Sequence, residues 1–476
     1  MVVSGMSTAL VLFRRDLRLA DNPALAAACD AHARILPVYI HAPDENDPWP
    51  AGAASRWWLH HSLASLQAEL RSRQCSLHLR EGDPLQILRV LIRQTGAQAV
   101  YWNRLYEPAS IARDTRIKGA LREQGIEVHT RNAALWLEPW QIATRQGEPY
   151  RVFTPYWRNL RSQLDIVPSL SKPPSSGWIE LPDSVALPAL NLLPRIRWDG
   201  GMTEAWRPGE PGAREMLEVF CDDALGDYAL ARDLPAHHGT SRLSPHLHFG
   251  EISPRQIRCA LLNHAQRLGA KRRPDIEPYL RELGWREFAH HLLYHFPQTP
   301  SENFNSRFDR FHWQPPDETL LTRWQRGRTG IPLVDAGMRE LWHTGWMHNR
   351  VRMIVASFLT KNLLQHWRHG ARWFWDTLVD ADLANNTLGW QWVAGCGADA
   401  APYFRVFNPV TQAKKFDPKG VYLKRWLPEL AHLPLDLLHE PWKSPSRPSR
   451  HNYPSPITDL TESRELALTR YRASRG

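Results

Sequence analysis

Short apolar runs rich in β-branched residues alternate with stretches of helical periodicity through the first 135 residues. The runs predict strands at 9–13, 35–41, 76–81, 98–103 and 126–130. The stretches between them predict helices at 22–33, 53–73, 83–95 and 109–124. Such alternation is typical of a parallel, doubly wound sheet, because each helix returns the chain to begin the next strand in the same direction. We therefore predict an α/β domain at 1–135.

The pattern changes beyond this domain. Residues 164–212 contain eight prolines and few periodic runs, so we predict a connector at 136–212. Between 213 and 430 helical stretches follow one another and strand signals nearly vanish, which predicts a second, all-α domain. The final segment, 431–476, is rich in Pro, Ser and Arg, and we expect a short, partly ordered tail there.

Composition and charge narrow the possible partners. Lys and Arg number 59 against 49 Asp and Glu, and the resulting net charge of +10 permits binding to nucleic acid. No apolar run reaches the roughly 18 residues of a membrane span, and the N-terminal charges follow the apolar run, the reverse of a secretory signal. We therefore expect a cytoplasmic protein with no membrane partner.

Several common sites are not indicated by the sequence. The turn after the first strand, FRRDLRL, lacks the G-x-G-x-x-G pattern of an ordinary dinucleotide site. Five widely spaced cysteines without a C-x-x-C pair predict neither a disulfide framework nor zinc. The histidine doublets at 60–61, 237–238 and 290–291 have no partner motifs, so we interpret them as packing or surface residues and expect no metal.

The segment DADLANNTLGWQW, residues 380–392, combines acids, amides and two indoles. On a helix, Asp382, Asn386 and Trp390 share one face at i, i+4 and i+8. Trp392 lies about 200° further round, so it faces a different space. This mixture suits neither a packed core nor a solvated surface, and it indicates a cavity for a ligand that is both polar and flat.

Three further segments are ambiguous when each is taken alone. The hydroxyls of GTSRLS (239–244) can hold a phosphate near a helix start or can serve as helix N-caps. In PYLRELGWREF, Glu282, Trp285 and Arg286 share a helical face, as a site or as an exposed ion pair beside a core indole. In WMHNRVRM, Asn349 and Met353 share a face, either in a site or as a core Met beside surface arginines.

Four long, ordered motifs resemble those of the photolyase/cryptochrome family, and most closely those of bacterial cyclobutane pyrimidine dimer photolyases. They are GTSRLSPHLHFGEISPRQ, LRELGWREF, TGIPLVDAGMRELWHTGWMHNRVRMIVASFLTK and DADLANNTLGWQWVAGCGADAAPYFRVFNP. The resemblance extends along nearly the whole chain. It implies an α/β antenna-chromophore domain followed by an all-α domain that binds FAD and DNA.

The resemblance also implies a set of cofactor contacts in the all-α domain. It assigns the phosphate side to 240–244, the diphosphate to Arg286, and a salt bridge beside the isoalloxazine to Arg352 and Asp380. It places Asn386 opposite flavin N5, whereas Tyr279 stands where some members have Trp. The complete set of matched positions is Tyr228, Thr240, Ser241, Arg242, Leu243, Ser244, Tyr279, Arg286, Arg352, Asp380, Asp382 and Asn386.

Three tryptophans match the family's electron-transfer chain. Trp390 would lie beside the flavin, Trp367 between, and Trp313 toward the surface. The helical placement of Trp390 on the Asp382 and Asn386 face agrees with this implied role. The alternative is a purely structural role, in which all three are core indoles.

The substrate side of the family site matches another set of residues. Those facing the lesion would be Glu282, Trp285, Asn349, Met353 and Trp392, and those on the DNA backbone would be Arg232, Arg350, Arg405 and Gln412. Photolyases extrude their target from the duplex and stack it between aromatic or apolar side chains. The implied reaction is light-driven: excited FADH⁻ passes one electron to a flipped-out pyrimidine dimer, whose ring then splits. We expect UV-damaged DNA as the partner of a monomer that joins the nucleoid when bound.

Two other functions, and the identity of the antenna chromophore, remain as alternatives. A (6-4) photolyase typically has His at the Met353 position and departs at Trp392. A cryptochrome photoreceptor commonly has a long C-terminal extension, whereas here the similarity is expected to end near 417–430 and only a short tail follows. The antenna is expected to be methenyltetrahydrofolate, with deazaflavin or an empty site as alternatives. Ala109 and Ser110 replace an Asn-Glu pair of some folate-binding members, and the 43–58 loop also departs from their pattern.

Overall fold

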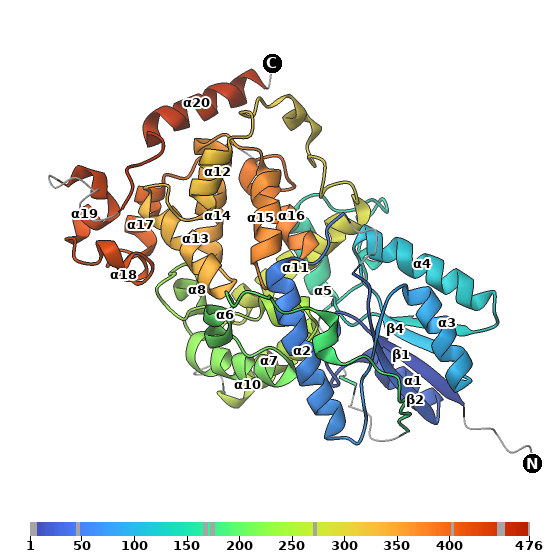
Figure 1. Cartoon of the computed structure of the whole chain (residues 1–476). Coiled ribbons are helices and arrows are strands. Elements are labelled where there is room, and N and C mark those ends of the chain that lie inside the picture. The colour runs from blue at the N-terminus through green and yellow to red at the C-terminus, as the bar shows by residue number, and fades with distance from the viewer. Residues whose placement is uncertain are drawn as a thin grey trace, which may run out of the picture.

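The computed structural model describes residues 7–43, 48–164, 170–171, 177–269, 274–400, 404–444 and 453–474, and it divides into a sheet domain and a helical domain (Figure 1). The sheet has five strands in the order β3-β2-β1-β4-β5, and all adjacent pairs are parallel. The strands are β1 (Thr8–Phe13), β2 (Arg34–His41), β3 (His78–Glu81), β4 (Ala99–Asn103) and β5 (Glu127–Arg131). The predicted doubly wound sheet is therefore confirmed.

Helices cover both faces of this sheet. They are α1 (Pro23–Ala31), α2 (Ala53–Arg71), α3 (Pro84–Thr95) and α4 (Pro108–Arg122). Along β1, Ala9, Val11 and Phe13 pack with α1 and α2, whereas Leu10 and Leu12 pack with α3 and α4. Successive side chains of a strand point to opposite faces, so an uninterrupted apolar run such as TALVLF is what a doubly covered strand requires. Asn22 and Asp83 begin α1 and α3 by accepting hydrogen bonds from backbone amides three residues on.

The second domain is helical, as predicted: every strand that the structure describes lies before residue 132. Its α-helices are α5 (Phe153–Ser162), α6 (Gly200–Ala205), α7 (Glu210–Val219), α8 (Tyr228–Ala231), α9 (Ser244–His248), α10 (Pro254–Arg267), α11 (Glu277–His295), α12 (Glu318–Gln325), α13 (Pro332–Thr344), α14 (Asn349–Ser357), α15 (Trp367–Thr377), α16 (Leu383–Ala394), α17 (Pro409–Phe416), α18 (Val421–Trp426), α19 (Leu435–His439) and α20 (Leu460–Ala473). The π-helical turns η3 (Phe220–Ala224) and η5 (Phe358–Asn362) continue α7 and α14. The 3₁₀ turns are η1 (Pro139–Gln141), η2 (Leu187–Leu190), η4 (Ser306–Arg310), η6 (Pro428–Leu430) and η7 (Pro441–Lys443).

The predicted connector and tail contain more structure than the sequence analysis placed there. Within 136–212, helix α5 buries Phe153, Tyr156, Trp157 and Leu160 against α11, and η2 and α6 follow it. In the tail, α20 packs on η5, and Tyr471 stacks on Phe404 with ring centroids 4.4 Å apart. Proline content hid the connector elements, because a proline at the first helical position begins a turn as readily as it breaks one.

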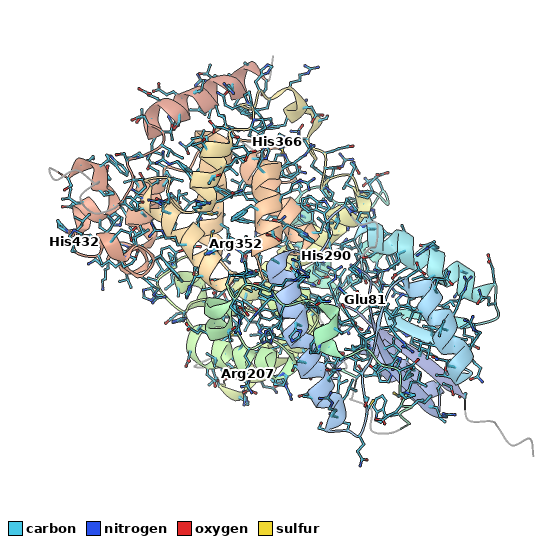
Figure 2. All side chains as sticks on the ribbon, viewed as in Figure 1. Glu81, Arg207, His290, Arg352, His366 and His432 are labelled. Carbon is cyan, nitrogen blue, oxygen red and sulfur yellow. The ribbon has the colours of Figure 1, made fainter. Side chains whose placement is uncertain are left out.

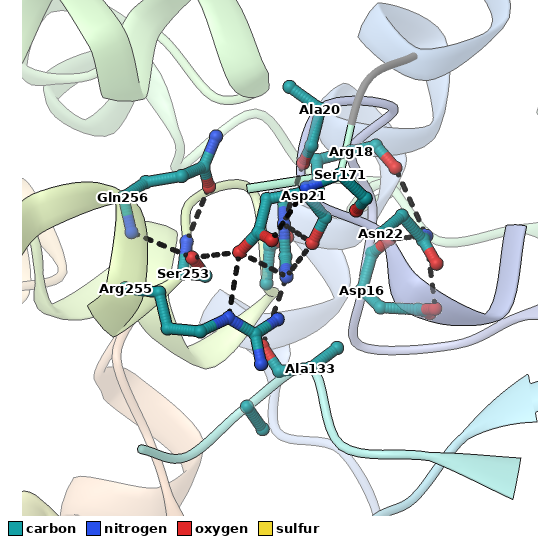
Figure 3. A network of polar contacts seen from close by, with 12 residues as sticks. Asp16, Arg18, Ala20, Asp21, Asn22, Ala133, Ser171, Ser253, Arg255 and Gln256 are labelled. Carbon is teal, nitrogen blue, oxygen red and sulfur yellow. Dashed lines mark hydrogen bonds and ion pairs between the residues drawn. The ribbon is translucent and has the colours of Figure 1, made fainter. Parts of the chain in front are cut away.

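Arg18 joins the two domains through a buried polar network (Figure 3). Its guanidinium, 1% exposed, donates to the carbonyls of Asp21 at 2.7 Å, Ala133 at 3.0 Å and Gly250 at 2.7 Å. The carboxylate of Asp21 in turn accepts from the Ser253 hydroxyl at 2.6 Å and from Arg255 Nε at 3.1 Å. The FRRDLRLADN segment, which has no glycine-rich loop, therefore binds the helical domain.

Replacing Arg18 with Met tests this network. The substitution keeps an apolar stem but leaves buried carbonyls of both domains without donors, so we expect the free energy of unfolding to fall by about 3 kcal/mol. Chemical denaturation followed by circular dichroism measures the change. Arg116→Met is the matched control, because its ion pair with Asp83 is largely exposed and such pairs contribute roughly 0–1 kcal/mol. Equal effects of the two variants would contradict the role of Arg18.

Candidate cofactor and substrate site

The N-terminus of α16 is organised by Asp382. Its Oδ1 accepts from the backbone amide of Asn385 at 2.9 Å and from that residue's side-chain amide at 2.6 Å, which caps the helix. One turn later, Asn386 Nδ2 donates to the Ala371 carbonyl of α15 at 3.0 Å. The prediction that Asp382 and Asn386 lie on one side of this segment agrees with the observed helix. A polar helix start is thereby held inside a largely apolar domain.

Asp380 connects three elements beside this helix start. Its Oδ2 accepts from Arg352 Nη2 of α14 at 2.8 Å and from the Ser244 hydroxyl of α9 at 2.6 Å. The expected ion pair between Arg352 and Asp380 is therefore present in the structure. The other oxygen, Oδ1, is buried and has no hydrogen-bond partner among the described residues. Figure 2 shows Arg352 near the centre of the molecule, where the helical domain approaches the sheet domain.

The predicted phosphate segment alternates between buried and accessible side chains. Thr240, Arg242 and Ser244 are partly or fully accessible, whereas Ser241 and Leu243 point into the domain. The Ser241 hydroxyl accepts from the Tyr279 hydroxyl at 2.8 Å and from the Leu243 amide at 3.3 Å. Tyr279 also meets the edge of the Tyr228 ring, centroid to centroid 5.2 Å. Tyr279 thus holds Ser241 in place and packs on Tyr228. The side chains of Thr240, Arg242 and Ser244 remain available to a ligand.

Arg242 is held in an unusual conformation above two indoles. Its φ of +52° lies in the left-handed region, which non-glycine residues seldom adopt. The guanidinium carbon lies 4.2 Å from the Trp206 ring centroid and 5.1 Å from that of Trp346, and Nε is buried without a hydrogen-bond partner. Burial lowers the pKa of Arg242 despite the nearby Glu340 carboxyl, which raises it. Sequence analysis missed Trp206 and Trp346, although Trp346 lies within a quoted motif.

The acid and arginine residues of the substrate set form pairs. Glu282 of α11 accepts from Arg232 Nη1 at 2.6 Å, and Arg350 of α14 donates to Asp233 at 2.7 Å. Arg350 also lies 3.9 Å from the Met353 sulfur. The segment after α8 therefore connects α11 and α14 through two ion pairs that are partly exposed. Two predicted DNA-contacting arginines are brought beside two predicted lesion-facing residues.

The two indoles of the substrate set have different supports. Trp285 stacks on Phe153 of α5, centroids 3.7 Å apart and planes 10° from parallel. Trp392 donates through Nε1 to the Asp399 carbonyl at 3.1 Å and remains partly exposed. Phe153 belongs to the segment that was predicted as connector, so the sequence analysis did not find it. Trp285 is therefore supported on a ring face, whereas Trp392 is held at its Nε1 edge.

The remaining predicted positions are more dispersed. Asn349 begins α14 and is exposed, as is Arg405. Gln412 lies on α17 and is partly buried. Arg286 donates to the Ala134 carbonyl at 2.8 Å, at the boundary with the sheet domain. The predicted residues around Asp380, Ser241 and Glu282 are therefore brought together more clearly than these four residues are.

Of the three tryptophans of the predicted chain, Trp313 is the most exposed. Trp390 and Trp367 are buried, whereas Trp313 is partly exposed. The His366 ring lies between the outer two, 5.6 Å from Trp367 and 5.1 Å from Trp313 by centroids. Trp390 packs against Phe374 and against Gly370, where an added Cβ would overlap its ring. Trp390 at 2% and Trp367 at 0% exposure are both fully interior, so burial sets only Trp313 apart, and the electron-transfer path stays a prediction.

In the residues that the structure describes, no helix combines the length and the apolar character needed to cross a bilayer. Within the same ranges, no group of three or more His, Cys, Asp or Glu side chains is arranged to hold a metal ion.

Comparison with known proteins identifies the family. Residues 9–175 match the family model described as DNA photolyase, and residues 279–473 match the FAD binding domain of DNA photolyase. A relative from Agrobacterium fabrum named deoxyribodipyrimidine photo-lyase is 46% identical, over 98% of this chain and 97% of its own. The chain belongs to the photolyase/cryptochrome family.

Solved structures and a plant relative extend this comparison within the photolyase/cryptochrome family. The crystal structure of a bacterial class III photolyase from Agrobacterium tumefaciens aligns over the whole of both chains with a TM-score of 0.93 and 44% identity. Cryptochrome-2 of Arabidopsis thaliana is 40% identical over 97% of this chain and 79% of its own. The expectation that similarity ends near 417–430 is wrong, because the family match continues to residue 473 and includes α20.

Two buried polar atoms in this family member fit a polar, charged cofactor such as FAD. Asp380 Oδ1 and Arg242 Nε have no hydrogen-bond partner among the described residues, and the exposed Ser244, whose hydroxyl donates to Asp380 Oδ2, lies beside them. Buried polar atoms without partners cost free energy, so a ligand that pairs with them is favoured. A carboxylate acceptor, a guanidinium donor and hydroxyls suit the hydroxyl, amide and phosphate groups of a flavin dinucleotide.

Replacing Gly370 with Ala tests the packing beneath Trp390. The added methyl group overlaps the indole, so we expect the free energy of unfolding to fall by roughly 1–3 kcal/mol. Gly389→Ala is the control, because its Cβ meets open space on α16 and the change should stabilise that helix by up to about 1 kcal/mol. Thermal and chemical unfolding measure both. A Gly370→Ala variant as stable as the parent protein would contradict this close contact.

Proposed function

We propose that the protein is a deoxyribodipyrimidine photo-lyase that binds FAD and uses light to repair cyclobutane pyrimidine dimers in DNA. The observation that carries the proposal is that α11, α14 and α16 each contain residues of both predicted sets. Arg352 of α14 pairs with Asp380, Arg350 of the same helix pairs with Asp233, and Glu282 of α11 pairs with Arg232. Relatives from Agrobacterium fabrum, Synechococcus and Escherichia coli that are named photo-lyases support it at 40–46% identity.

The cofactor would be held by residues from four segments. Thr240, Arg242 and Ser244 would bind its phosphates, and Arg352, Asp380 and Asn386 would bind the isoalloxazine side. When bound, reduced FAD supplies the light-driven electron that the ring-opening reaction needs. The protein's own contribution is to exclude water and to fix the polar contacts before light is absorbed. The cations Arg242 and Arg352 both lie near the face of Trp346, which restricts their orientations.

The substrate would be held by stacking and by one carboxyl group. Trp285 is stacked on Phe153 and Trp392 is held by a hydrogen bond from Nε1. Base stacking on an indole contributes roughly 1–3 kcal/mol per base. Glu282 is held in place by Arg232 and can hydrogen-bond the flipped-out pyrimidines. Arg232, Arg350, Arg405 and Gln412 would orient the duplex through its phosphates without reading its sequence.

Other functions and the antenna remain proposals of lower rank. The Synechocystis cryptochrome structure aligns with a TM-score of 0.88 at 29% identity, so a photoreceptor is the second candidate. Met353 and Trp392 favour dimer repair over (6-4) repair. We propose methenyltetrahydrofolate as the antenna, with deazaflavin or an empty site as the outcomes that a spectrum of released chromophores would distinguish. We also propose that the protein acts on UV-damaged DNA as a monomer.

Glu282→Ala should lower the yield of light-dependent repair of a thymine-dimer oligonucleotide by about tenfold, the equivalent of one lost charged hydrogen bond of roughly 1.4 kcal/mol. Flavin content should stay nearly unchanged, because Glu282 belongs to the substrate side. Glu277→Ala is the matched control, since this acid begins the same helix and pairs with Arg161 away from the site. Loss of flavin in Glu282→Ala would give Glu282 a structural role. Absence of repair by fully reduced parent protein would favour the photoreceptor.

Trp390→Phe should slow the photoreduction of oxidised FAD severalfold, because phenylalanine is much harder to oxidise than tryptophan. Repair by chemically reduced protein should be largely unaffected, since that reaction begins with the cofactor already reduced. Trp57→Phe, a buried indole of the sheet domain, is the control. Transient absorption measures the rate. Normal photoreduction in the Trp390→Phe variant would remove this residue from the path.

A further inference from the structure

Two buried imidazoles face the carboxylate that begins α16. Asp382 Oδ2 lies 3.5 Å from His290 Nε2 of α11 and 3.7 Å from His248 Nδ1 of α9. The three side chains are 9%, 7% and 6% exposed, in the order Asp382, His290, His248. Asp382 Oδ1 accepts the hydrogen bonds of the helix cap, and Oδ2 is the oxygen that faces the two histidines. The sequence analysis had interpreted His290 as a packing or surface residue.

Both ring nitrogens of His290 face oxygen acceptors. Its Nδ1 lies 2.9 Å from the Arg286 carbonyl, and its Nε2 faces the Asp382 carboxylate. Both neighbours are acceptors only, and a neutral imidazole has just one N–H. A neutral His290 would therefore point a lone pair either at a carbonyl or at a carboxylate. The imidazolium satisfies both contacts.

The charges contributed by the sheet domain lead to the same protonation state. Arg15, directly after β1, forms an ion pair with Glu107, the residue before α4. Burial lowers the pKa of the Arg15 guanidinium, but Glu107 and, more weakly, Asp382 raise it by more, so it stands above its ordinary value. Asp382 and Glu107 are thus two buried anions, and Arg15 supplies one cation. Arg113, which acts more weakly on Arg15, is paired with Asp114 at 3.1 Å. An imidazolium at His290 would match the anion that remains among Arg15, Glu107 and Asp382.

The other groups around His290 do not supply that charge. Burial lowers the pKa of His248, which disfavours its charged form. Glu287 follows Arg286 on α11, and burial raises its pKa to about 7. Tyr106 presents its ring to His290 at 6.4 Å, and its hydroxyl donates to Glu138 at 2.7 Å. Burial is also the first influence on Asp382 and opposes ionisation, but His290 and then His248 outweigh it, so the pKa of Asp382 lies well below its ordinary value.

We propose that His290 is a positioning residue of the cofactor site, which as an imidazolium holds the Asp382 carboxylate in place for FAD. The Arg15–Glu107 pair completes the charge balance from the sheet domain. This inference rests on the proposed function, in which Asp382 contacts the flavin. It adds that residues of both domains together determine the electrostatic environment of Asp382, at the start of α16.

FAD affinity of the full-length protein, measured by flavin fluorescence, tests the proposal. His290→Leu should weaken binding about tenfold, as expected when a charge-assisted contact is lost. His290→Arg keeps the cation and should restore affinity to near that of the parent. His264→Leu is the matched control. His264 is a buried histidine of α10 that lies 3.6 Å from Asp222, away from the site. Affinity unchanged in His290→Leu, or equally weak in His290→Arg, would overturn the proposal.

Asp382→Asn separates failure of the inference from failure of the proposed function. Asparagine still caps a helix, so the substitution removes mainly the charge. If Asp382→Asn leaves FAD affinity unchanged, the placement of the flavin beside Asp382 fails. If it weakens affinity while His290→Leu does not, only the role of His290 fails. Nitrogen-15 spectra of histidine-labelled holoprotein, assigned by the signal missing in His290→Arg, report protonation directly. A single neutral tautomer at pH 7 would also overturn the proposal.

Discussion

The guanidinium of Arg18 is surrounded by carbonyl oxygens from both domains, and it could not remain buried if either domain withdrew. Removing a charged group from water is costly, and its hydrogen bonds must compensate nearly in full. Burial lowers the pKa of Arg18 to about 10, which still leaves it charged at neutral pH. The domain boundary is therefore held in one arrangement. Contacts that cross it, such as the hydrogen bond from the Leu19 amide to Glu210, depend on that arrangement.

Helix α16 converts this fixed boundary into a site. Its first residue is preceded by Asp382, which faces histidines of α9 and α11, and its last turn contains Trp390 and Trp392 on different sides. Gly370 lets α15 approach Trp390 closely, so the indole is held by packing, whereas Trp392 is held by one hydrogen bond and stays partly open. One helix thus presents a charged start, a buried indole and an accessible indole. A ligand on each side of α16 would meet a different chemistry.

Periodicity was sufficient for the parts of the fold that repeat a simple pattern. The five strands and four helices of the sheet domain lie close to their predicted ranges, because β1, β2 and β4 are largely apolar runs and strands alternate with helices throughout. Helix α5 was missed although Phe153, Tyr156, Trp157 and Leu160 have helical spacing, since neighbouring prolines dominated the segment. The Arg352–Asp380 pair came from family resemblance and not from spacing. Phe153 beneath Trp285, and Trp206 beneath Arg242, could not be predicted because such contacts join residues more than 30 positions apart.

The arginines nearest the substrate side are already engaged, which affects how DNA can bind. Arg232 donates to Glu282 and Arg350 donates to Asp233, each at an ion-pair distance below 3 Å and each partly exposed. Exposed pairs of this kind contribute little to stability, so a phosphate can take the guanidinium at small cost. Glu282 would then lose its partner at the moment when a lesion enters, and its carboxyl group would be free to bond the bases. Backbone binding and lesion recognition would in this way share one ion pair, which links the net charge of +10 to the chemistry of the site.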